Sequence, residues 1–170
     1  MQADTVRLYT CGYSERRTYL IAALFVAGNI ALPQLFHLVP RGGLIWLPIY
    51  FFTLIAAYKY GWKVGLLTAI LSPLLNSAIF GMPPVAGLPA IITKSVLLAL
   101  AAGFTANRCK KVTIAILAGV VLGYQVLGTL LEWAWVGNFH AAIQDFRLGI
   151  PGMLLQVVGG YLLIRYAIRK

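Results

Sequence analysis

Acidic residues are scarce in this sequence, and their scarcity limits the chemistry that the chain can perform. Four Asp and Glu residues stand against fourteen Lys and Arg residues, which gives a formal net charge of +10 at pH 7. Catalysis by paired carboxylates therefore has few candidates. The patterns H-E-x-x-H, G-x-S-x-G and G-x-x-x-x-G-K-[ST] are all absent from the sequence. We therefore expect neither an enzyme nor an ATPase, and no cofactor bound by the chain itself.

Charged residues as a whole are few, and hydrophobic residues dominate. They make up 11% and 61% of the 170 residues respectively, which is far from the composition of a soluble domain. Long, continuously apolar runs exclude the alternating pattern of a membrane β-barrel. We predict one all-α integral membrane domain over residues 1–170, with a segment 1–18 before a six-helix bundle at 19–168. The predicted transmembrane helices are 19–38, 44–58, 62–80, 85–106, 112–136 and 148–167. The second is short and begins beside Gly42, Gly43 and Pro48, so we expect it to be tilted or irregular.

The basic residues predict the orientation of these six helices. With six spans, one side of the membrane holds eleven of the fourteen Lys and Arg residues: Arg7, Arg16, Arg17, Lys59, Lys63, Arg108, Lys110, Lys111, Arg165, Arg169 and Lys170. Basic loops favour the cytoplasm, so both termini are predicted to be cytoplasmic. Cys11 and Cys109 fall on the same reducing side, and we expect no disulfide. The two histidines lack metal-ligand spacing, and we expect no metal site.

Polar residues inside the predicted spans gather near the opposite, external side. Such residues are costly in hydrocarbon and mark cavities or pairings. Two tryptophans at the same depth are candidates to stack on a flat ligand, or ordinary residues of the membrane interface. The candidate ligand-binding residues are Gln34, His37, Trp46, Asn76, Lys94, Glu132, Trp133 and Gln156.

Lys94 and Glu132 form the sharpest pair within this group. Each charge offsets the desolvation cost of the other if they are in contact. Two interpretations are equally favoured by the sequence. The pair either fixes two helices against each other, or one or both residues contact a polar ligand, with Lys94 donating to a carboxylate or carbonyl oxygen.

Alanines recur every fourth residue in the first span, at Ala23, Ala27 and Ala31. This spacing lines small side chains along one helix face, where another helix can approach closely. Spacing alone favours packing within the chain's own bundle over packing against another subunit.

The external connection Gly81–Pro89 reads G-M-P-P-V-A-G-L-P and carries no charge. Proline and glycine at this density favour fixed turns. One interpretation is a lid over an external pocket with Met82 and Val85 directed inward; the other is a short packed loop.

These features together resemble the substrate-binding S-component of an energy-coupling factor (ECF) vitamin transporter. The resemblance lies in the chain length, the six-helix layout, the alanine stripe, Leu32-Pro33-Gln34-Leu35-Phe36-His37, Leu47-Pro48-Ile49, Ser72-Pro73-Leu74-Leu75 and Gly81-Met82-Pro83-Pro84. It covers residues 19–170.

The resemblance implies a substrate-capture subunit in the plasma membrane of a prokaryote. Such a subunit binds a small vitamin or related heterocycle in an outward-facing pocket and delivers it by toppling in the bilayer. The implied partners are a transmembrane coupling subunit, which would meet Ala23, Ala27 and Ala31, and two ATPase subunits that use ATP. An accessory membrane subunit without its own ligand and a small stand-alone transporter are the alternatives.

Overall fold

The structure is a computed structural model that describes residues 8–167, and these residues form helices without any strand. Within these described residues, four helices are long and apolar enough to cross a membrane. They are α1 (Arg16–Phe36), α4 (Trp62–Phe80), α5 (Leu88–Cys109), which follows a 3₁₀ turn η2 (Val85–Gly87), and α6 (Ile114–Val136). The first, third, fourth and fifth predicted spans therefore correspond to continuous helices.

The second predicted span, 44–58, is broken into three pieces. These are α2 (Gly42–Trp46), a 3₁₀ turn η1 (Pro48–Tyr50) and α3 (Phe51–Tyr60). Leu47 joins the first two with a left-handed backbone, φ 45°, and Pro48 cannot donate a helical hydrogen bond. The ten residues of α3 rise about 15 Å, half of a membrane's hydrocarbon core. The expected irregularity is therefore confirmed, and this segment is not a regular transmembrane helix.

The last predicted span, 148–167, is also irregular. Two short helices, α7 (Phe139–Ala142) and α8 (Gln144–Leu148), meet the final helical segment at a bend of 55°. That segment alternates α9 (Ile150–Leu154), a π-helical turn η3 (Leu155–Gly159), α10 (Gly160–Leu162) and a second π-helical turn η4 (Leu163–Ala167). With the bent pair counted as one span, the described residues contain five candidate spans.

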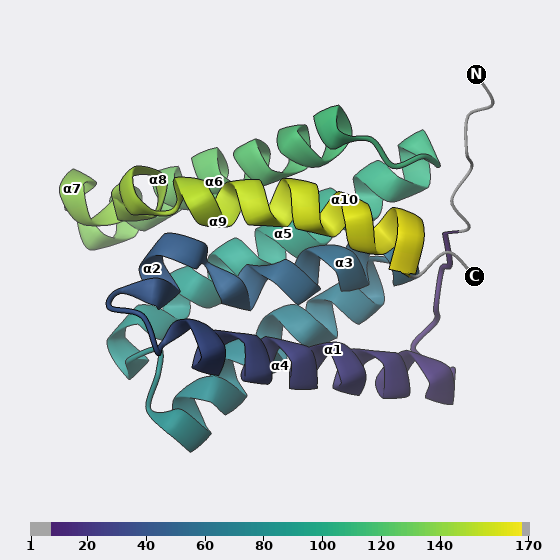
Figure 1. The fold of residues 1–170 in the computed structure, drawn as a ribbon, viewed down its shortest axis with the longest axis horizontal. Helices are drawn as coiled ribbons and strands as arrows, with labels where there is room; N and C mark the ends of the chain where they lie inside the picture. The colour runs from purple at the N-terminus through teal and green to yellow at the C-terminus, as the bar shows by residue number, and fades with distance from the viewer. Residues whose placement is uncertain (1–7, 168–170) are drawn as a thin grey trace.

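Helix α3 is short but lies at the centre of the bundle (Figure 1). All of its residues from Thr53 to Lys59 are buried. Small residues let its neighbours approach closely: a Cβ on Gly65 of α4 would lie 2.8 Å from the Cα of Ala57. The core is thus built around a helix too short to span the membrane.

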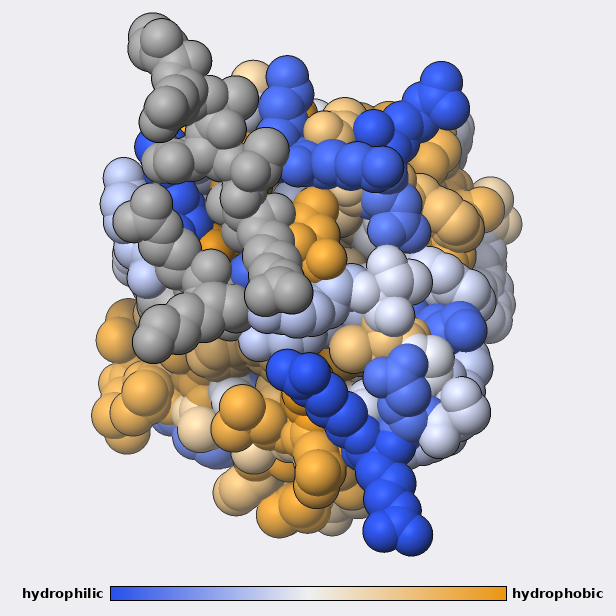
Figure 2. Space-filling view, turned by 90° about the vertical axis from the view of Figure 1, so that its right-hand side faces the viewer, coloured by the Kyte–Doolittle hydropathy of each residue, from blue (hydrophilic) through white to orange (hydrophobic). Residues whose placement is uncertain are grey.

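The bundle has two distinct ends (Figure 1). One end, which we call the basic end, holds the start of α1, the α3–α4 and α5–α6 connections and the end of the final helix. The other, which we call the cavity end, holds α2, the α4–α5 connection, α7 and α8. Figure 2 views the basic end and shows hydrophilic residues gathered over it, with hydrophobic surface around its rim.

Candidate ligand-binding site

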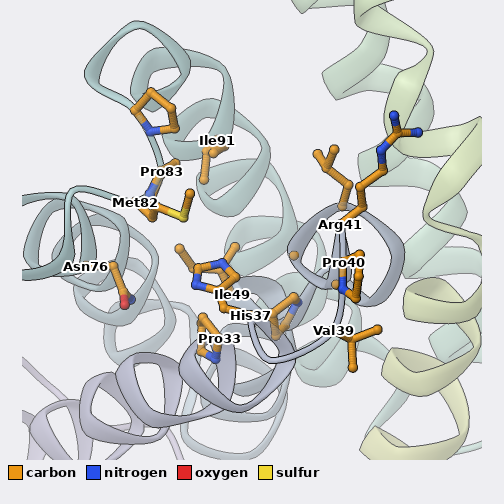
Figure 3. A pocket seen from close by; sticks show the side chains of 15 residues that line it. Pro33, His37, Val39, Pro40, Arg41, Ile49, Asn76, Met82, Pro83 and Ile91 are labelled. Atoms are coloured by element: carbon orange, nitrogen blue, oxygen red, sulfur yellow. The ribbon is translucent and has the colours of Figure 1, made fainter.

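A cavity of about 550 Å³ opens at the cavity end of the bundle. It lies between the end of α1, α2, η1 and the α4–α5 connection (Figure 3). Its volume falls in the range of small-molecule sites. The lining is mainly apolar and consists of Pro33, His37, Val39, Pro40, Arg41, Gly42, Gly43, Leu44, Pro48, Ile49, Asn76, Met82, Pro83, Pro84 and Ile91.

An unusual backbone shapes one wall of this cavity. Arg41 and Leu47, at the two ends of α2, have left-handed conformations with φ 58° and 45°. Residues other than glycine adopt this conformation at a cost of about 1–2 kcal/mol each. Gly42 lies against the carbonyl oxygen of Phe36 so closely that a Cβ would clash with it. The turn therefore requires glycine at position 42, and its strain is of the kind found at binding sites.

Two of the predicted site residues, His37 and Asn76, line the cavity. Asn76 is held from α1 because its Nδ2 donates to the backbone oxygen of Asn29 at 2.9 Å. Gln34 does not line the cavity, and its Nε2 donates to Asn76 Oδ1 at a long 3.5 Å. Asn29 in turn donates to Thr53 Oγ1 at 3.0 Å. Polar side chains of α1, α3 and α4 thus fix the inner wall of the cavity.

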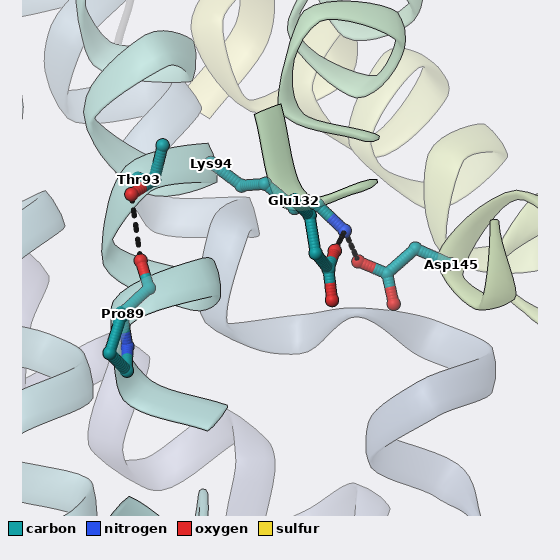
Figure 4. Close-up of polar contacts among 5 residues, drawn as sticks. All are labelled: Pro89, Thr93, Lys94, Glu132 and Asp145. Carbon is teal, nitrogen blue, oxygen red and sulfur yellow. Dashed lines mark hydrogen bonds and ion pairs between the residues drawn. The ribbon is translucent and has the colours of Figure 1, made fainter. Parts of the chain in front are cut away.

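Lys94 and Glu132 form the ion pair that the sequence predicts, but they are not alone. Lys94 Nζ lies 2.6 Å from Glu132 Oε2 and also 2.6 Å from Asp145 Oδ2 (Figure 4). We call these three residues the charged triad. It joins α5, α6 and α8. Asp145 is not among the residues predicted from sequence, because it lies in the connection after α6, outside every predicted span.

Glycine 128 creates the space in which the triad forms. The side-chain stem of Lys94 crosses α6 at this position, and a Cβ on Gly128 would lie 2.6 Å from Lys94 Cγ. Lys94 is 3% exposed at its side chain, whereas the side chains of Glu132 and Asp145 are 17% and 16% exposed. The ammonium is therefore buried behind two carboxylates that solvent still reaches.

Several buried polar groups near the triad have no hydrogen-bond partner among the described residues. Two of them, Gln125 and Thr129, lie on the same face of α6 as Glu132 of the triad, at spacings of four and three residues. The Tyr124 hydroxyl donates to Gln156 Oε1 at 2.9 Å, which leaves the Nε2 of this predicted site residue unpaired. The unpartnered atoms are Ser95 Oγ, Gln125 Nε2 and Oε1, Thr129 Oγ1 and Gln156 Nε2. We call Ser95, Gln125, Thr129 and Gln156 the unpaired polar set.

The two predicted tryptophans do not line the cavity. Trp46 stacks on Phe36 with ring centroids 5.3 Å apart. Trp133 is 45% exposed and meets Phe139 edge to face. Each ring already has an aromatic neighbour within the chain, and neither faces the space where a ligand would bind in the cavity.

The loop at 81–89 contributes to the cavity only in part. Met82, Pro83 and Pro84 line it. The expectation that Val85 also points inward is wrong, because Val85 is 76% exposed at the start of η2. The chain lines the cavity again at Ile91 of α5.

All three alanines of the stripe, Ala23, Ala27 and Ala31, are exposed on the outer face of α1. Large apolar neighbours on the same helix, Leu20 and Leu24, are also more than 70% exposed. Packing of the stripe within the chain's own bundle, which the spacing alone favoured, is therefore wrong. The buried residues of α1 are Thr18, Ala22, Phe25, Val26, Asn29 and Pro33.

Comparison with known proteins places the chain in no family. It matches no family model, no curated protein and no solved structure.

Proposed function

We propose that this chain is the substrate-capture subunit of an ECF-type importer in the plasma membrane of a prokaryote. Its six membrane segments would be the four long helices, the broken segment 42–60 and the bent final segment, with both termini in the cytoplasm. The outward-facing cavity would bind a small vitamin or related heterocycle. A coupling subunit and two ATPase subunits would then drive delivery.

One observation carries this proposal: an exposed face of small residues on α1 lies on the same helix as part of the cavity lining. Its exposed face bears Ala23, Ala27 and Ala31, while Pro33 and His37 at its end line the cavity. Small residues on a lipid-facing helix allow close approach of another helix. A helix that touches both a ligand and a partner is suited to link capture with delivery.

The candidate binding residues divide into two groups around this site. His37 and Asn76 belong to the cavity, with Gln34 behind Asn76. Lys94, Glu132 and Gln156 belong to the region between α5, α6 and the final helix. Ile91 of the cavity lies about one helical turn from Lys94 on α5. One ligand whose parts differ in polarity would suit both groups.

The test separates docking from binding. Ala27→Leu places a larger side chain on an exposed position, so we expect the variant to fold and to keep its ligand. We expect uptake by cells that express the chain with a coupling subunit and ATPases to fall at least tenfold. Ala115→Leu, at an exposed alanine of α6, is the matched control and should leave uptake unchanged.

Binding itself is measured by thermal unfolding of the purified chain against a panel of vitamins. A ligand at 100 times its Kd stabilises the folded state by about 2.7 kcal/mol. Stabilisation by no vitamin would favour an accessory subunit. Uptake that needs no ATPase would favour a stand-alone transporter instead.

A further inference from the structure

The charged triad carries a surplus negative charge. One ammonium faces two carboxylates, Glu132 and Asp145, so the three side chains sum to −1 when ionised. The one cation on α8, Arg147, lies exposed, and no ion pair joins it to either carboxylate among the described residues. Two of the four acidic residues in the sequence thus form ion pairs with one lysine, Lys94.

The geometry of the triad leaves part of both carboxylates available. Lys94 Nζ contacts one oxygen of Glu132 and one of Asp145, and the second oxygens of both point to the same side of the ammonium (Figure 4). Both carboxylates are partly exposed while Lys94 is buried. An incoming group therefore meets carboxylate oxygens before it meets the ammonium.

The unpaired polar set supplies a second, independent indication of a ligand. Gln125 and Gln156 are fully buried and Thr129 is 6% exposed, yet each has a polar atom without a partner among the described residues. Each such group costs about 1–3 kcal/mol when nothing binds it. Thr129 lies beside Gly128, where the Lys94 stem crosses α6, and three residues before Glu132. Thr129 therefore lies on the same face of α6 as Glu132 of the triad.

The helix that carries Gln156 is distorted at this position. Gln156 lies in the π-helical turn η3, and such turns recur at functional sites. The Tyr124 hydroxyl fixes the Oε1 end of its amide. This bond fixes the orientation of the Gln156 amide, so its unpaired Nε2 is a fixed donor between α6 and the final helix.

From these observations we infer that the charged triad, with the unpaired polar set, binds the cationic nitrogen group of a small organic ligand, such as an ammonium or amidinium. This inference rests on the proposed function only in that the chain binds a small molecule. It reverses the expectation for Lys94 from sequence: the lysine neutralises one carboxylate and positions both, and the carboxylates contact the ligand. Amide and hydroxyl groups of the unpaired polar set bind neutral parts of the same ligand.

Three probes of nearly equal shape test the sign of the recognised charge. Benzamidinium, benzamide and benzoate are titrated against the full-length chain in lipid nanodiscs, and thermal stabilisation gives each apparent Kd. A charge-assisted hydrogen bond favours the cation by about tenfold to a hundredfold. We therefore expect benzamidinium to bind at least tenfold more tightly than benzamide, and benzoate to bind more weakly than benzamide.

Two variants locate this preference. Asp145→Asn keeps the side-chain shape and removes the surplus charge, so the ratio of benzamidinium to benzamide affinity should fall to near one. Glu132→Gln removes the carboxylate on α6 and should lower the same affinity ratio, so it replaces the first variant if that one does not fold. Glu15→Gln removes one negative charge at the basic end and should leave the ratio unchanged.

Several results would overturn the inference. They are tightest binding of benzoate, binding of none of the three probes, or an unchanged preference for the cation in both triad variants. A vitamin that stabilises the chain while benzamidinium does not would overturn the inference and leave the proposed function intact. If a vitamin binds but its uptake depends neither on Ala27 nor on ATPases, the proposed function is overturned and the inference about the charged triad stands.

Discussion

The two ends of the bundle differ in how completely their polar groups are satisfied. At the basic end, backbone and aromatic groups hold the chain together. The Tyr9 amide donates to the Lys59 oxygen at 2.8 Å, and the Tyr9 ring stacks on Tyr60 at 5.7 Å. The Lys59 ammonium and the Arg17 guanidinium lie 5.4 and 5.5 Å from the centre of the Tyr9 ring. Charges here find partners although carboxylates are scarce.

At the cavity end, the opposite holds. From the middle of the bundle toward this end, Ser95, Gln125, Thr129 and Gln156 have buried polar atoms without a partner among the described residues. Two of the three non-glycine residues with left-handed backbones in the described chain, Arg41 and Leu47, border a cavity here. Proteins retain strained and unsatisfied groups mainly where function requires them. We therefore expect the basic end to supply stability and the cavity end to supply recognition.

The largest effect is expected from overpacking the basic end. A Cβ on Gly103 of α5 would lie 2.7 Å from the backbone nitrogen of Trp62, and backbone atoms cannot move aside cheaply. Because the clash is with backbone, Gly103→Val should destabilise the chain by about 3 kcal/mol or more, or prevent folding. Thermal unfolding in detergent measures the loss. The control is Gly119→Val on α6, where a Cβ has open space; an equal loss in both would contradict the prediction.

A smaller effect on the free energy of unfolding is expected when a buried amide is replaced, and it should differ between an amide with hydrogen-bond partners and one without. Asn29 and Gln125 are both fully buried amides. Asn29 donates to Thr53 and Ser72 and accepts from the amide of Phe52 in the first turn of α3. Asn29→Leu should cost about 1–3 kcal/mol because those partners lose their bonds.

Gln125→Leu, in contrast, should leave stability unchanged or raise it, since the Gln125 amide has no partner to lose among the described residues. The same variant should weaken ligand binding. Urea or thermal unfolding compares the two variants. A large loss of stability from Gln125→Leu would show that this amide is structural, and the contrast between the hydrogen-bonded Asn29 and the unpaired polar set would fail.

The long helices and the Lys94–Glu132 pair could be predicted from the sequence for simple physical reasons. Continuous apolar runs of about 20 residues have one stable solution in a membrane, a helix. A lysine in such a run requires an anion, and Glu132 is the only acidic residue in a predicted span. Gly42, Gly43 and Pro48 likewise indicated where the second segment breaks.

Other features could not be predicted from the sequence, because hydropathy does not determine them. Asp145 reaches Lys94 only because α7 and α8 fold back after Gly137, and a loop's direction is not encoded in its apolar content. The alanine spacing defines a face of α1, but not whether that face is covered. Coverage depends on Phe25 and Asn29, whose contacts with α3 and α4 turn the alanines outward.

The smallest effect, one of reactivity alone, tests both the packing of the basic end and the proposed orientation. Cys11 is buried there and Cys109 is exposed at the end of α5. Burial, with a contribution from the nearby carboxylate of Glu15, raises the pKa of the Cys11 thiol above its ordinary value. Because the thiolate is the reactive form, Cys11 should react with maleimide more slowly than Cys109 at neutral pH, and its reaction rate should increase as the pH rises.

The same labelling reaction tests the orientation of the chain. In sealed vesicles, a membrane-impermeant maleimide should label Cys109 only from the cytoplasmic side. Cys109→Ser identifies the labelled site. Labelling of Cys109 from the outside would reverse the orientation and turn the cavity toward the cytoplasm.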